Sequence, residues 1–248
     1  MSNPDLFLIS VGLAAGFIDS IAGGGGLIAL PAMSLIVGPG VEAIGTNKMA
    51  SLAAASIAFL VYHRKGHVDW KSSILFTAFV GIGAFCGSVT AQFISPEVFP
   101  WLLLITCPLI LYLVWKRDLW TVRALHPGRA TFAAVSLSGL AAGFYDGVWG
   151  PGGGTLMFLG LLFFARLPLL TALAASKLAN TVAAMVGLST YAAAGHVHPH
   201  EGAMLASGML VGGFFGANLA STNASRVVRP ALLVIVALLA ARVVALYA

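Results

Sequence analysis

Long apolar segments follow one another along almost the whole chain, with only short polar turns between them. Crossing a bilayer takes about 20 residues of α-helix. The last three segments of each half reach about this length, the second is too short, and the first is interrupted by an acid and glycines. In order, the segments span residues 6–22, 27–37, 43–62, 72–94 and 98–115, and then 130–149, 155–165, 169–194, 203–221 and 227–246. This pattern predicts membrane-spanning helices together with a broken helix or re-entrant hairpin in each half.

The scarcity of charge supports a lipid environment. Charged residues make up 8% of the chain and hydrophobic residues 59%, whereas roughly a quarter of a soluble domain is charged. We therefore expect an all-α, polytopic integral membrane protein that crosses the bacterial inner (plasma) membrane several times and contacts membrane lipid. The net charge of +5 is typical of Lys and Arg in cytoplasmic loops. No basic run is interleaved with aromatic residues, so we expect no nucleic-acid partner.

The two halves of the chain repeat one another. Asp19 and Asp146 lie 127 residues apart, and Lys48 and Lys177 lie 129 residues apart. Further matches pair Gly26 with Gly154, Gly66-His67-Val68 with Gly195-His196-Val197, and Gly83-x3-Gly87-x3-Ala91 with Gly212-x3-Gly216-x3-Ala220. The Gly-x3-Gly stripes predict close helix–helix contacts. The sequence thus predicts a first membrane repeat over residues 1–117, a cytoplasmic connector over 118–129 and a second repeat over 130–248.

The basic residues predict that the repeats are inverted. The loop that carries Arg64, Lys65 and Lys71 should be cytoplasmic, and so should the basic connector between the halves. The corresponding loop after Gly195 has His and Glu but neither Lys nor Arg. We therefore expect that loop, and both termini, on the outer face.

Four charged side chains fall inside otherwise apolar sequence. An ionisable group at membrane depth costs at least about 2.5 kcal/mol, so its presence twice at matching places favours a function. Lys48 and Lys177 are candidates for holding an anion, while Asp19 and Asp146 are candidates for proton coupling or for a structural ion pair. The alternative is that all four only form ion pairs that hold helices together.

Polar and glycine neighbours of these charges are candidates for the same site. Side chains near the lysines offer hydrogen-bond donors, and backbone N–H groups at a helix start attract anions. The candidate substrate-binding residues beside the lysines are Thr46, Asn47, Ser51, Ser176 and Asn180, and those at the glycine runs are Gly23, Gly24, Gly25, Gly26, Gly152, Gly153, Gly154 and Thr155. The alternatives are polar contacts between helices and glycines that permit close packing.

Metal binding and catalysis have little support in the sequence. His196, His198 and His200 alternate beside Glu201, a spacing that could hold a metal, but a loop at the water interface explains them as well. No Ser/His/Asp set, Cys/His pair or pair of carboxylates falls in one accessible segment. We therefore expect no metal site, no cofactor and no enzymatic activity.

The motifs that carry these residues resemble the TauE/SafE sulfite exporter family of membrane permeases. They are GLAAGFIDSIAGGGG, TNK and YHRKGHVDW in the first half, and GLAAGFYDGVWGPGGGT, SKLAN and AGHV in the second. The resemblance covers nearly the whole chain. It implies movement of sulfite, sulfonates or related sulfur oxyanions across the plasma membrane, without fixing the compound or the direction.

Residues and resemblance together favour a secondary transporter for small sulfur-containing anions, working by alternating access. An anion channel, with Lys48 and Lys177 as selectivity charges, is the alternative. A membrane enzyme would be a third class, for which the sequence offers no site. The sequence does not define the oligomeric state.

Overall fold

A computed structural model describes residues 4–98 and 132–247, and within these ranges the chain is helical and contains no strand. The helices of the first half are α1 (Pro4–Ala22), α2 (Gly26–Val37), α3 (Val41–Arg64), α4 (Trp70–Ala91) and the short 3-10 helix η1 (Pro96–Val98). Those of the second half are α6 (Phe132–Val148), α7 (Gly153–Phe163), α8 (Leu169–Ala193) and α9 (Pro199–Tyr247). The expected all-α fold is confirmed.

The helices reproduce the two classes of apolar segment. Five stretches of the described residues are long and apolar enough to cross a membrane, in α1, α3, α4, α8 and the first part of α9. Helices α2, α6 and α7 are apolar but shorter. Asn223 interrupts α9 with non-helical dihedral angles (φ −131°, ψ 35°), and it separates the last two predicted segments. The predicted segment 98–115 and the connector 118–129 lie almost wholly outside the described residues.

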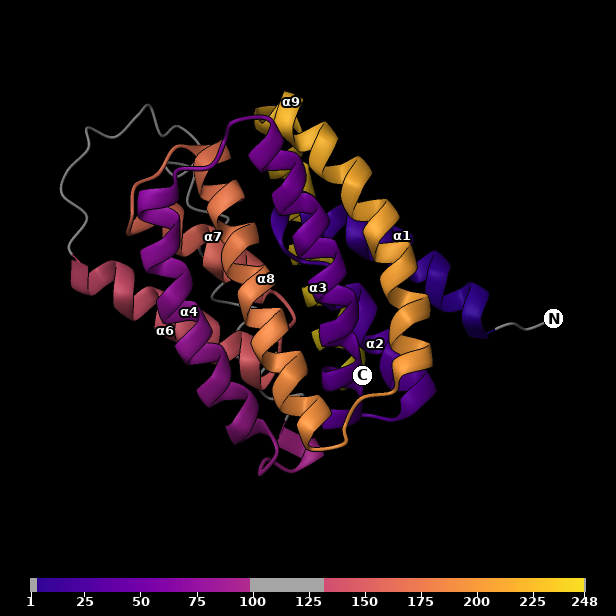
Figure 1. Ribbon diagram of the computed structural model, residues 1–248. Coiled ribbons are helices and arrows are strands. Elements are labelled where there is room, and N and C mark those ends of the chain that lie inside the picture. The colour runs from indigo at the N-terminus through magenta and orange to yellow at the C-terminus, as the bar shows by residue number, and fades with distance from the viewer. Residues whose placement is uncertain (1–3, 99–131, 248) are drawn as a thin grey trace.

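The repeats interlock through their fourth helices (Figure 1). Helix α4 packs against α6 and α8 of the second half, and α9 packs against α1 and α3 of the first half. The two long central helices, α3 and α8, also pack against each other. Each half therefore completes the helix packing of the other, and neither forms a separate compact unit.

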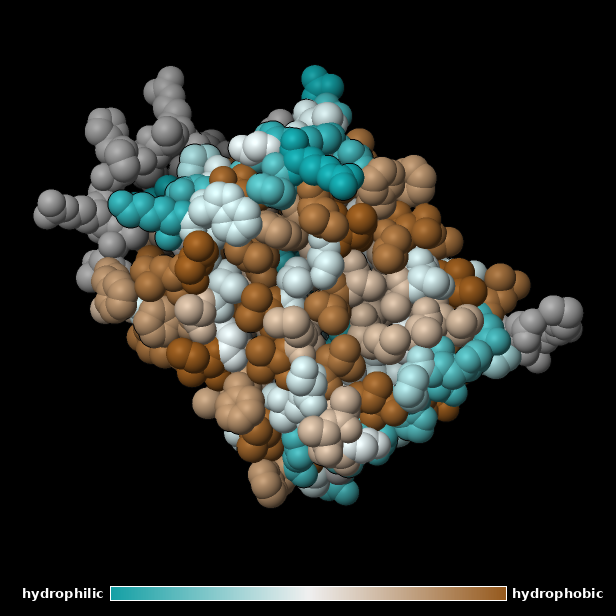
Figure 2. Space-filling view, viewed as in Figure 1, coloured by the Kyte–Doolittle hydropathy of each residue, from teal (hydrophilic) through white to brown (hydrophobic). Residues whose placement is uncertain are grey.

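Corresponding helices run in opposite directions. In Figure 1 the α3–α4 connection lies at the top of the long helices, whereas the corresponding α8–α9 connection lies at the bottom. Figure 2 shows hydrophilic residues gathered near these two ends and a largely hydrophobic band between them. These directions fit inverted repeats. The orientation in a membrane stays a prediction.

Glycines allow the exchanged helices to approach closely. A Cβ built on Gly83 or Gly87 of α4 would lie less than 3.0 Å from backbone atoms of α6. A Cβ on Gly212 or Gly216 of α9 would collide in the same way with the backbone of α1. The predicted Gly-x3-Gly contact stripes are therefore confirmed.

The short helices fold back on the long ones. Gly25, at the start of α2, lies so close to Ala15 of α1 that an added Cβ would be 2.5 Å from the Ala15 carbonyl oxygen. If the helix continued straight, these two residues would be about 15 Å apart. The break after α1 is therefore a reversal of the chain, as in a hairpin.

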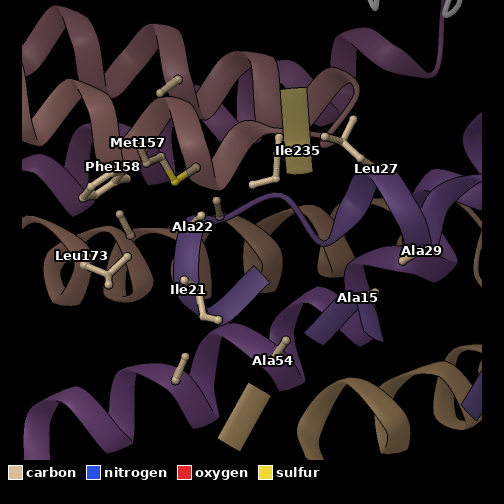
Figure 3. Close-up of a cluster of buried hydrophobic side chains, with 14 of the residues drawn as sticks. Ala15, Ile21, Ala22, Leu27, Ala29, Ala54, Met157, Phe158, Leu173 and Ile235 are labelled. Carbon is tan, nitrogen blue, oxygen red and sulfur yellow. The ribbon is translucent and has the colours of Figure 1, made fainter. Parts of the chain in front are cut away.

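Buried apolar side chains surround the breaks (Figure 3). They come from α1, α2, α3, α7 and α8, together with Ile235 from the second part of α9. Ile235 lies directly over Gly24, where an added Cβ would collide with it. The labelled members are Ala15, Ile21, Ala22, Leu27, Ala29, Ala54, Met157, Phe158, Leu173 and Ile235. This packing fixes the breaks within the protein interior.

Candidate functional site

The two glycine breaks lie against each other between the central helices. A Cβ on Gly23 would lie less than 3.0 Å from the backbone of Gly154 and Thr155, and one on Gly26 would lie 3.2 Å from Cα of Pro151. The Thr155 hydroxyl donates a hydrogen bond to the Ala22 carbonyl oxygen, at 2.8 Å. The start of α7 therefore lies on the end of α1.

Two buried ion pairs join the repeats at this junction. The Lys48 Nζ is 2.6 Å from Asp146 Oδ2, and the Lys177 Nζ is 3.1 Å from Asp19 Oδ2. The four side chains are between 1% and 7% exposed. Each ammonium also donates to the main-chain carbonyl oxygen of its aspartate. Each lysine thus binds the acid of the other repeat.

Each carboxylate also lies at the start of the short helix in its own repeat. The Gly25 N–H donates to Asp19 Oδ1, at 3.2 Å. A Cβ on Gly153 would lie less than 3.0 Å from Asp146 Oδ1, so that carboxylate contacts the first residue of α7. The N-terminus of a helix carries a partial positive charge. Each aspartate is therefore held by a lysine on one side and a helix start on the other.

The lysine stems lie within the protein rather than in a solvent path. The Lys48 stem runs along Gly187 of α8, whose added Cβ would be 3.2 Å from Lys48 Cε. Both lysines lie about 11 Å along their helices from the helix start. Because α3 and α8 run in opposite directions, the two lysines reach the junction of the breaks from opposite ends of the bundle.

Two tyrosines that the sequence interpretation missed support the breaks. The Tyr62 hydroxyl donates to the Ser20 carbonyl oxygen at 2.8 Å, and the Tyr191 hydroxyl donates to the Gly147 carbonyl oxygen at 2.7 Å. Each acceptor is the residue directly after an aspartate, and both tyrosines are fully buried. The sequence contains a signal for them, because the two tyrosines are 129 residues apart, the same spacing as the two lysines.

The remaining candidate residues fall into two groups. Asn180 lies at the start of α7, since its amide nitrogen would be 3.3 Å from a Cβ built on Gly154. The Asn47 Nδ2 instead donates to the Ser51 hydroxyl of its own helix, at 3.5 Å. Thr46 and Ser176 instead use their hydroxyl groups elsewhere, Thr46 with the His198 N–H and Ser176 with its own helix. The structure therefore brings together the acids, lysines, glycines, Thr155 and Asn180, while the substrate-binding roles stay predictions.

The histidine residues form a separate polar cluster. His196 Nδ1 and His198 Nε2 lie 2.9 and 3.1 Å from the two carboxylate oxygens of Glu42, and His200 contacts Asp5. Within the described ranges, no group of three or more side chains has the arrangement of a metal site. These contacts tie the α8–α9 connection to the starts of α1 and α3.

Comparison with known proteins gives a consistent result. Residues 8–243 match the family model described as "Sulfite exporter TauE/SafE". The chain is 32% identical to a "Probable membrane transporter protein ORF9" of Sinorhizobium sp. over 96% of its length and 92% of the relative. It is 29% identical to a "Probable membrane transporter protein" of Haemophilus influenzae (96% and 93% covered), and 28% identical to the "Probable membrane transporter protein YfcA" of Escherichia coli (95% and 87% covered).

No solved structure matches the chain. The relatives' names point to a membrane transporter rather than an enzyme. The family match extends over both halves and includes the glycine breaks, the aspartates and the lysines. The chain is a multi-pass membrane transporter protein that belongs to the TauE/SafE sulfite exporter family.

Proposed function

We propose that the protein is a secondary transporter that moves small sulfur-containing anions, such as sulfite or sulfoacetate, across the plasma membrane by alternating access. The observation that carries this proposal is the pair of buried lysines at two repeat-related helix starts. Lysine and backbone N–H groups are the donors that an oxyanion needs. The name of the family supports the sulfur-containing substrate class.

The interlocked repeats supply a route to alternating access. The two lysines reach the junction of the breaks from opposite ends of the antiparallel helices α3 and α8. In transporters with inverted repeats, one set of helices moves against the other around a site formed by broken helices. Here such a motion would expose one helix start and its lysine to one face at a time.

An anion channel is less well supported by the geometry. A selectivity charge in a channel must face the permeating ion. Each buried lysine is instead neutralised by a carboxylate within 3.1 Å. A permanently open path lined by these pairs would offer little net attraction to an anion.

Transport by purified protein in proteoliposomes tests the proposal. We expect uptake of labelled sulfite or sulfoacetate by the parent, and at least about a tenfold loss in Lys48→Ala and Lys177→Ala, since one charge-assisted contact is worth about 1.5–3 kcal/mol. The matched control is Lys71→Ala, because Lys71 is exposed in the first turn of α4.

Single lysine variants leave a buried carboxylate without its partner, so folding needs its own control. The double variants Lys48→Ala/Asp146→Asn and Lys177→Ala/Asp19→Asn remove both charges of a pair and should insert normally. Parent-like uptake by all four variants would refute the proposed site. Ohmic single-channel currents from the parent would favour the channel instead.

A further inference from the structure

The two aspartates already occupy the positions that a bound oxyanion would need. Asp19 uses one carboxylate oxygen to accept from the Gly25 N–H and the other to accept from Lys177. Asp146 contacts the first residue of α7 and accepts from Lys48. A sulfonate or sulfite group presents oxygens of the same kind to the same donors. An incoming anion and the resident carboxylate therefore compete for one lysine and one helix start.

An amide side chain lies beside one of these positions. Asn180 is 4% exposed, and its amide nitrogen would be 3.3 Å from a Cβ built on Gly154 in the first turn of α7. An amide nitrogen is a hydrogen-bond donor, which is the kind of group that an oxyanion accepts from. An anion at this helix start would therefore have a side-chain donor beside it.

Charge balance decides what must accompany the anion. Among the described residues, the buried titratable side chains are Asp19, Asp146, Lys48, Lys177, Tyr62 and Tyr191. Helices α2 and α7 contribute none, and no other charged side chain is buried beside the carboxylates. The two acids and two lysines sum to zero charge. An added monoanion would leave one buried negative charge uncompensated, which is strongly unfavourable in a dry interior.

We propose that each aspartate is a built-in competitor of the substrate, which an anion displaces only when the carboxyl group takes up a proton. The neutral acid releases its lysine and its helix start, and the anion takes both. One proton is bound for each negative charge that enters, so the buried site stays neutral throughout. This inference rests on the proposed function, and it assigns proton-coupled movement of anion and proton in the same direction.

Binding of methanesulfonate to the purified protein tests this coupling. This sulfonate keeps a single negative charge between about pH 5 and pH 8, so any proton change comes from the protein. In weakly buffered solution, we expect the parent to take up about one proton per anion bound. We also expect its Kd to rise by up to about tenfold per pH unit, the limit for one linked proton. Both quantities are measured on the unmodified protein.

Variants then locate the proton. Asp19→Asn and Asp146→Asn mimic the neutral acid, so in the double variant we expect a Kd that no longer depends on pH and no proton uptake. These variants should be purified with methanesulfonate present, because each leaves a lysine without its carboxylate. The matched control is Glu42→Gln. Glu42 lies at the α3 start and contacts His196 and His198, away from the lysine–aspartate pairs. This variant should keep the parent's pH dependence of Kd.

The outcomes separate this inference from the function on which it rests. Methanesulfonate binding without proton uptake would refute the inference and leave the transporter intact. A pH dependence that persists in the double aspartate variant and disappears in Glu42→Gln would also refute it. No binding of methanesulfonate, sulfite or sulfoacetate to the parent would overturn the proposed substrate class, and the inference with it.

Discussion

Glycines in this protein differ sharply in what surrounds them. Gly83 of α4 faces the α6 backbone, and an added Cβ would lie less than 3.0 Å from the Leu140 oxygen and the Phe144 nitrogen. Gly81, half a turn earlier, faces only the Val182 side chain, at 3.2 Å from the added Cβ. Backbone atoms cannot move aside without separating the helices, whereas a side chain can shift slightly. Equal substitutions at these two sites should therefore have opposite consequences.

We predict that Gly83→Ala lowers the stability of the protein by about 1–3 kcal/mol, the usual cost of overpacking. Gly81→Ala should be neutral or stabilising, because alanine favours helix by about 1 kcal/mol over glycine. Thermal unfolding of both variants in detergent measures the difference. Similar melting temperatures for the two variants would contradict the close α4–α6 contact.

The partners of the buried charges can be tested at the same scale. Asp19→Asn should destabilise the ligand-free protein by about 3–5 kcal/mol, because it leaves the Lys177 charge buried without a counter-charge. Adding Lys177→Gln should restore most of that stability. Adding Lys48→Gln should not, since Lys48 pairs with Asp146. Unfolding measurements on the three proteins would contradict the pairing if Lys48→Gln restored stability equally well.

The elements themselves were largely predictable from the chain. The observed helices follow the apolar segments closely, and the kink at Asn223 falls between the last two. The identity of each lysine's partner was not predictable, since either aspartate satisfies the same chemistry. The exchange of α4 and α9 between halves was also hidden, because a helix that is apolar on every side does not specify its neighbour. Only the glycine stripes indicate where helices pack closely, and they do not identify the partner helix.

At the element scale, the tyrosines hold the ends of α1 and α6. Tyr62→Phe removes the hydrogen bond to the Ser20 carbonyl oxygen, so we predict faster amide exchange in residues 23–26 and a loss of about 1–2 kcal/mol. Tyr191→Phe should accelerate exchange in residues 150–154 instead, because it releases the Gly147 carbonyl oxygen. Each variant is the control for the other in hydrogen-exchange mass spectrometry. Exchange that rises equally at both breaks would show that the tyrosines act on overall stability only.

For the whole molecule, the opposed directions of the repeats determine where two matching residues lie. Arg64 at the end of α3 and Ala193 at the end of α8 are 129 residues apart, and both are exposed. Helices α3 and α8 pack against each other and run in opposite directions. If each crosses the membrane once, these two ends lie at opposite sides of the bundle. Basic residues near Arg64 favour the cytoplasmic side for that end. Ala193 should then face outward.

We predict that a membrane-impermeant maleimide labels Ala193→Cys in intact cells, and labels Arg64→Cys only after the membrane is opened. The background protein should carry Cys86→Ser and Cys107→Ser, since Cys86 is exposed on α4 and would react by itself. A permeant maleimide, which should label both variants, controls for reactivity. Labelling of both positions from one side would mean that the repeats are not inverted across the membrane. A motion that exposes the two lysine–aspartate pairs alternately to the two sides would then lose its structural basis.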